Sequence, residues 1–119
     1  MIDNIEYFFK EGCFVLELHN TAADPAVSVA RVRVAPGDTT RWHGVRGIHE
    51  RYLSLEGNAL AEIGPEPPFA VRPGDVVRIP PGVRQRITNT GTSDLIFLAV
   101  CTPRFVAEAY QDLESAPTA

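Results

Sequence analysis

The chain has 119 residues and a formal net charge of −4 at pH 7. This length fits one domain with a modest core, and the acidic charge argues against a nucleic-acid or membrane-surface partner. Its apolar runs are all shorter than the ~20 residues of a membrane span, and the N-terminal residues lack the basic and apolar regions of a signal peptide. We therefore expect a cytoplasmic protein that binds neither nucleic acid nor membranes.

Short runs rich in Val, Ile, Leu and Phe are separated by Pro, Gly, Asn and Asp along the chain. In the run AVSVARVRV, apolar Ala30, Val32 and Val34 alternate with Arg31 and Arg33, which is the period of a half-buried strand. Many short strands joined by regular turns predict an all-β sandwich or barrel.

The chain divides into four expected parts of a single domain. Residues 1–26 are expected to form N-terminal strands, and residues 27–102 the core of the barrel. Residues 103–114 are expected to form a short C-terminal helix, because Val106, Ala109, Tyr110 and Leu113 share one helical face. Residues 115–119 are expected to fray.

Two related phrases, PGDTT and PGDVV, open two gapped motifs. The first contains Gly37, His43, Glu50 and Gly57, and the second contains Gly74, Pro80, Gly82 and Asn89. They resemble the two signature motifs of the cupin superfamily, G-x5-H-x-H-x3,4-E-x6-G and G-x5-P-x-G-x2-H-x3-N. The resemblance implies a small single-domain bacterial cupin with a double-stranded β-helix, or jelly-roll, barrel. The four glycines are expected at turn positions with positive φ.

Two motif histidines are replaced, because Val45 and Gln85 stand at their positions. The resemblance implies a divalent metal ion such as Fe, Mn, Ni or Zn, held here by His43 and Glu50 with Gln85 as a weak third ligand. His49 is a less favoured substitute, because strand alternation aims it away from its neighbour Glu50. The alternative is that His43, Gln85 and Glu50 satisfy one another by hydrogen bonds, as buried polar groups must.

The same strand parity suggests a ligand site. Arg41 shares the parity of His43, so its guanidinium is expected near Tyr52 and Gln85, where the three would bind a small and acidic ligand. A salt bridge from Arg41 to Glu50 or to an acid at the rim is the alternative. Tyr52 is the candidate proton donor.

Three functions follow from these residues. The first is a metal-dependent enzyme of the dioxygenase, isomerase or lyase type acting on a small polar substrate. The second is a non-catalytic module that binds or senses a small molecule without a metal, and the third is a structural domain with a filled barrel. We also expect a homodimer, because the outward residues Leu53 and Leu55 are apolar enough to need a partner surface.

Overall fold

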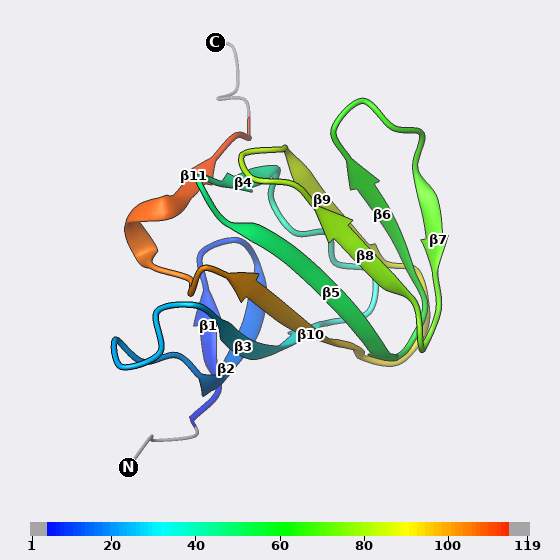
Figure 1. Cartoon of the computed structure of the whole chain (residues 1–119). Coiled ribbons are helices and arrows are strands. Elements are labelled where there is room, and N and C mark those ends of the chain that lie inside the picture. Colours follow the sequence, from blue (N-terminus) through cyan, green and yellow to red (C-terminus); the bar gives the residue numbers. More distant parts are fainter. Residues whose placement is uncertain (1–4, 115–119) are drawn as a thin grey trace, which may run out of the picture.

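The computed structural model describes residues 5–114, which form two antiparallel β-sheets. The six-stranded sheet has the order β1-β2-β3-β10-β5-β8, and the five-stranded sheet has the order β11-β4-β9-β6-β7 (Figure 1). The strands are β1 (Tyr7–Phe9), β2 (Cys13–His19), β3 (Ser28–Val34), β4 (His43–Val45), β5 (His49–Glu56), β6 (Ala59–Ile63), β7 (Phe69–Val71), β8 (Val76–Ile79), β9 (Gln85–Asn89), β10 (Leu95–Thr102) and β11 (Tyr110–Asp112). This arrangement confirms the predicted all-β jelly-roll barrel.

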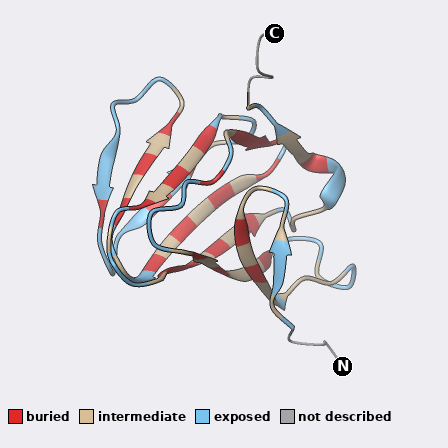
Figure 2. Cartoon of the chain, turned by 180° about the vertical axis from the view of Figure 1, so that it is seen from behind, coloured by how far each residue is buried: buried red, intermediate tan, exposed pale blue. Residues whose placement is uncertain are grey.

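The core lies between the two sheets. Along β5 and β9 buried residues alternate with less buried ones (Figure 2). Each strand therefore turns one row of side chains inward. Val32 and Phe97 from the six-stranded sheet pack in one cluster with Ala61 and Ile87 from the five-stranded sheet. The predicted period of two therefore marks the face of each strand that closes the barrel.

The C-terminal helix predicted for residues 103–114 is wrong. This segment contains a 3-10 turn, η1 (Ala107–Ala109), followed by β11, which pairs with β4 in the register Tyr110↔Val45. Pairing gives hydrogen-bond partners to the edge of β4, and the apolar spacing that suggested a helix buries Ala109 beside Val45 instead. Within residues 5–114 no helix is long and apolar enough to cross a membrane. The expected frayed tail, residues 115–119, lies outside the described residues.

The motif glycines have the predicted backbone. Positive φ angles occur at Gly37, Gly57, Gly74 and Gly82. At Gly57 the turn also leaves no room for a side chain, because a Cβ there would lie 2.9 Å from the carbonyl oxygen of Asp94. The glycines thus fix the turns that bring the motif strands together.

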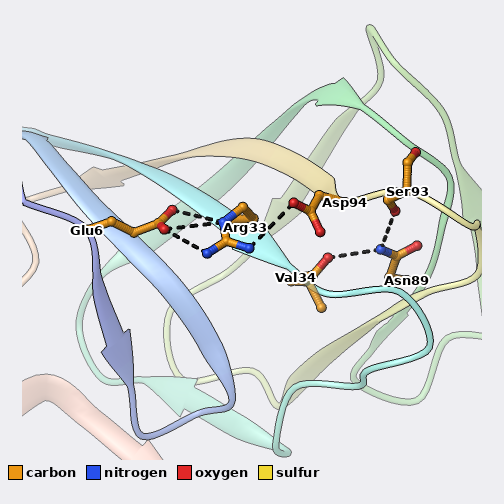
Figure 3. Close-up of polar contacts among 6 residues, drawn as sticks. All are labelled: Glu6, Arg33, Val34, Asn89, Ser93 and Asp94. Atoms are coloured by element: carbon orange, nitrogen blue, oxygen red, sulfur yellow. Dashed lines mark hydrogen bonds and ion pairs between the residues drawn. The ribbon is translucent and has the colours of Figure 1, made fainter.

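Asn89, the last residue of the second motif, holds two loops together. Its side-chain amide is buried and donates to the carbonyl oxygens of Val34 at 2.9 Å and Ser93 at 2.8 Å (Figure 3). Next to it, the Arg33 guanidinium lies between the carboxylates of Glu6 and Asp94 (Figure 3). These contacts give Asn89 a structural role at one end of the barrel.

Candidate functional site

Four of the residues singled out from the sequence meet inside the barrel. Glu50 and Tyr52 point inward from β5 of one sheet, and His43 and Gln85 point inward from β4 and β9 of the other, where they are Cα partners. All four are buried, with relative exposures of 2% for His43, 8% for Glu50, 5% for Tyr52 and 1% for Gln85. Such deep burial requires that each polar atom has a partner.

Gln85 links Glu50 to Tyr52. Its Nε2 donates to Oε1 of Glu50 at 2.8 Å, and its Oε1 accepts a hydrogen bond from the Tyr52 hydroxyl. The Cys101 thiol lies 3.8 Å from the other Glu50 oxygen. An amide side chain suits the position between Glu50 and Tyr52, because it offers both a hydrogen-bond donor and an acceptor. The Gln85 oxygen, which would be its metal ligand, is thereby engaged by Tyr52.

His43 has an oxygen partner at each ring nitrogen. Nδ1 lies 2.7 Å from the carbonyl oxygen of Arg41, and Nε2 lies 3.0 Å from Oε2 of Glu11. A carbonyl oxygen only accepts, so Nδ1 carries the proton that it donates. The ring also stacks on Tyr110, with the centroids 5.4 Å apart. The imidazole is therefore fixed by three different segments of the chain.

Glu11 is the site residue that the sequence did not reveal. It lies in the turn between β1 and β2, outside both motifs. An acid before a glycine in a hairpin turn is common on protein surfaces, so the local sequence carries no signal that this side chain enters the barrel. Only the packing of the hairpin against the segment that leads into β4 brings it to His43.

The buried charges shift one another's protonation. Burial raises the pKa of Glu50 from 4.5 to about 7, and the charge of Glu11 adds to this rise, while the Gln85 hydrogen bond and His43 oppose it. Burial alone would lower the pKa of His43, but the hydrogen bond and charge of Glu11 outweigh it, so this pKa is raised. A carboxyl group that titrates near neutral pH inside a barrel is a candidate for binding or proton transfer.

These residues do not fit the metal ion that the cupin motifs imply. The nitrogens of His43 and the amide of Gln85 already have partners, and Val45 is 4% exposed within an apolar cluster. Among residues 5–114 no group of three or more His, Cys, Asp or Glu side chains is arranged to hold a metal. One imidazole and one carboxylate are also fewer donors than protein sites for such metals use.

The structure places two other predicted residues outside this group. Arg41 is exposed, and its Nε donates to Oδ2 of Asp112 at 3.1 Å, so the expectation that it lies beside Tyr52 and Gln85 is wrong. Arg41 precedes β4, where strand alternation does not apply, and β11 brings Asp112 to it. His49 lies on the other face of β5 from Glu50, with Nε2 3.4 Å from Nη1 of Arg78.

Two adjoining hollows open at the end of the barrel near the β1–β2 hairpin. The inner cavity, of about 50 Å³, reaches Glu50 and Cys101, and the outer hollow, of about 400 Å³, extends toward Arg104 and Glu108. Both are lined by Tyr7, Phe9, Glu17 and Phe105. Of the predicted site residues only Glu50 lines either hollow; Tyr52 and Gln85 lie behind it in the core.

Comparisons with known proteins agree with the fold. The cupin domain family matches residues 30–101. The uncharacterized protein MJ1618 of Methanocaldococcus jannaschii is 32% identical over 91% of this chain and 87% of its own length. A predicted oxalate decarboxylase from Thermotoga maritima superimposes with a TM-score of 0.70 and 29% identity, covering 76% of this chain and 80% of that one. The oxalate decarboxylase of Bacillus subtilis, which has Mn(II) centers, gives a TM-score of 0.78 at 22% identity. The match covers 92% of this chain but only 30% of the decarboxylase chain.

Proposed function

The chain belongs to the cupin domain family, and we propose that it is a member that binds a small molecule in its barrel without a metal ion. One observation carries this proposal: the atoms that would bind the metal are engaged in hydrogen bonds, whereas the adjoining mouth of the barrel is hollow. The outer hollow, of about 400 Å³, is largely open to solvent, so it would receive the body of a ligand without enclosing it. A ligand there would extend its tip into the inner cavity toward Glu50.

The lining favours a neutral or cationic ligand over an acidic one. Glu11, Glu17 and Glu50 line the inner cavity, together with apolar and aromatic side chains. Among the residues that line the two hollows, Arg104 is the cation, and its Nη1 already donates to Asn20 at 2.9 Å. A dianion such as oxalate would meet like charges at the inner end. We therefore propose a ligand with an apolar or aromatic body and a hydrogen-bond-donating or amine end.

A thermal-shift screen tests this proposal. The panel contains small primary amines with apolar bodies, and a counter-panel contains oxalate and other small dicarboxylates. We expect amines to raise the Tm of the wild-type protein, and we expect Glu17→Gln or Phe105→Ala to abolish the gain. Arg41→Ala is the matched control, because it changes a charged residue away from the hollows and should keep the gain. Stabilisation by dicarboxylates alone, or a gain that survives both lining variants, would contradict the proposal.

A second candidate function is acid–base catalysis at Glu50. Burial raises the pKa of this carboxyl to about 7, and the side chain lines the inner cavity, so it is suited to exchange a proton with a bound substrate near neutral pH. This would be an isomerase- or lyase-type reaction. Tyr52, the proton donor expected from the sequence, is less well placed, because its hydroxyl donates to Gln85 behind the cavity lining.

Proton exchange into a bound ligand distinguishes the two functions. In D2O, an enzyme that uses Glu50 would introduce deuterium at a carbon of the ligand. Glu50→Gln would stop the exchange, while Arg41→Ala, which lies away from the hollows, would leave it unchanged. A ligand that binds without exchange in the wild-type protein would leave binding as the function.

A further inference from the structure

The β1–β2 turn is bonded to the barrel by both the main chain and the side chain of Glu11. The Arg41 N–H donates to the Glu11 carbonyl at 2.8 Å, and the Glu11 carboxylate lies 3.0 Å from His43 Nε2. His43 Nδ1 in turn contacts the Arg41 carbonyl at 2.7 Å, which closes a ring of three contacts. Gly12, with φ of +97°, allows the tight turn that presents Glu11.

This ring reverses the role of the motif histidine. A histidine that binds a metal offers a lone pair at one nitrogen and donates the proton of the other to an oxygen. In this chain Nδ1 makes that oxygen contact, but Nε2, the nitrogen left for a metal, faces a carboxylate. Glu11 thus stands where a cation would bind His43.

The side chains at the other metal-ligand positions of the motifs also contact residues of this chain. Gln85 bridges Glu50 and Tyr52, so the carboxylate that would join the metal has an amide partner. Val45 packs with Ile48 in an apolar cluster. The interior polar groups are therefore bonded to one another rather than arranged around a common point.

We propose that Glu11 occupies the position at His43 Nε2 that a metal ion would take in a cupin with the full set of motif ligands, and that the Glu11–His43 pair ties the β1–β2 hairpin to this end of the barrel. The proposal concerns the chain's own residues and does not depend on whether a ligand binds in the hollows. It makes Glu11 a positioning residue, which holds His43 and the hairpin in place.

Restoring the motif histidines tests this substitution directly. The variants are Val45→His/Gln85→His with Glu11 intact and the same pair combined with Glu11→Ala. The matched control combines the two histidine substitutions with Glu17→Ala instead of Glu11→Ala. Glu17 lines the same cavity as Glu11 but does not contact His43. Binding of Zn²⁺ is measured by calorimetry, and Co²⁺ is added as a probe, because its visible absorption reports the coordination number and geometry of the bound ion.

We expect removal of Glu11 to tighten Zn²⁺ binding to the restored site by about tenfold or more, because His43 Nε2 becomes available. The Glu17 control should not tighten it. Equal affinities with and without Glu11, or the absence of binding in both restored proteins, would overturn the proposal.

Stability gives a second measurement that does not need the histidine variants. In the otherwise wild-type chain, Glu11→Ala should lower the Tm by about 10 °C, because it leaves the buried His43 ring without the partly buried partner of its Nε2 atom. Glu17→Ala should lower it by no more than about 3 °C. If Glu11→Ala does not fold, Glu11→Gln keeps the bulk and removes the charge, and it should still lower the Tm more than Glu17→Gln does. Equal shifts for the two glutamates would overturn the proposed role of Glu11.

Discussion

The Nε2 atom of His43 lies 3.0 Å from the Oε2 atom of Glu11, which belongs to the turn between β1 and β2. His43 is a metal-ligand position of the first cupin motif, yet in this chain its partner is a carboxylate from outside both motifs. The motif residues that shape the fold are thus kept in this chain, while the partner of the motif histidine is a carboxylate. The fold depends on glycines, a proline and strand spacing, whereas the metal site depends on three imidazoles and one carboxylate.

Loss of the Gln85 side chain should destabilise the protein strongly. Gln85→Ala leaves the Tyr52 hydroxyl and a Glu50 oxygen without their partners in the core, so we expect the free energy of unfolding to fall by about 3 kcal/mol. Chemical denaturation measures the change. The control is Arg86→Ala on the outer face of the same strand, which breaks an ion pair with Glu62 and a stacking contact with Trp42 and should cost about 1 kcal/mol. Similar losses in the two variants would contradict the role of Gln85 as a bridge.

The stability of the protein should fall as the pH rises from about 5 to 7. The folded chain holds the Glu50 proton more tightly than the unfolded chain, because burial raises the pKa of Glu50 from 4.5 to about 7. The Glu50 proton contributes fully to the free energy of unfolding below pH 4.5. This contribution, about 3 kcal/mol at most, is lost as the pH rises from 4.5 to about 7. The raised pKa of His43 acts in the same direction at pH values above 6.5.

The variant Glu50→Gln isolates the Glu50 contribution, because an amide cannot titrate. Unfolding free energies measured from pH 4.5 to 7 should fall less in this variant than in the wild-type protein. Parallel curves would show that Glu50 has an ordinary pKa in the folded state.

Two motif glycines should differ in their tolerance of a side chain. Both Gly57 and Gly37 have positive φ, but a Cβ at Gly57 would lie 2.9 Å from the Asp94 carbonyl oxygen, while one at Gly37 would meet nothing within 4 Å. We expect Gly37→Ala to cost about 1 kcal/mol and Gly57→Ala about 3 kcal/mol. Thermal and chemical denaturation measure the loss of unfolding free energy in each variant. Equal losses at Gly37 and Gly57 would contradict the expected clash with Asp94.

The sequence predicted the parts of the structure that depend on local pattern. Alternation of apolar and polar residues identified strands such as β3, and the motif spacing placed the turns at the four positive-φ glycines. The same alternation places Glu50 and Tyr52 on the inner face of β5. These features follow from backbone geometry, which neighbouring residues largely determine.

The features that the sequence did not predict depend on contacts between distant segments. Residues 110–112 form a strand because β4 offers a free edge, not because their own spacing favours one. Arg41 turns outward because that strand brings Asp112 to it. Glu11 enters the barrel because its hairpin packs there. In each case the deciding partner lies far along the chain, where local pattern carries no information.

We propose that the protein forms a homodimer through the outer face of the six-stranded sheet. Leu55 on β5 is 41% exposed and Val76 on β8 is 62% exposed, and Val76 is the Cα partner of Leu53. Sedimentation velocity should show a dimer that Val76→Arg converts to a monomer. Phe69→Arg, on β7 of the other sheet, is the control and should remain a dimer. A wild-type protein that sediments as a monomer at every concentration tested would contradict the proposal.

The most direct test of a barrel that functions without a metal ion is the metal content of the protein purified without an affinity tag. Elemental analysis should find Fe, Mn, Ni and Zn well below one equivalent per chain, and added Mn²⁺ or Zn²⁺ should leave the Tm unchanged. One equivalent of any of these metals, lost in His43→Ala, would contradict the account.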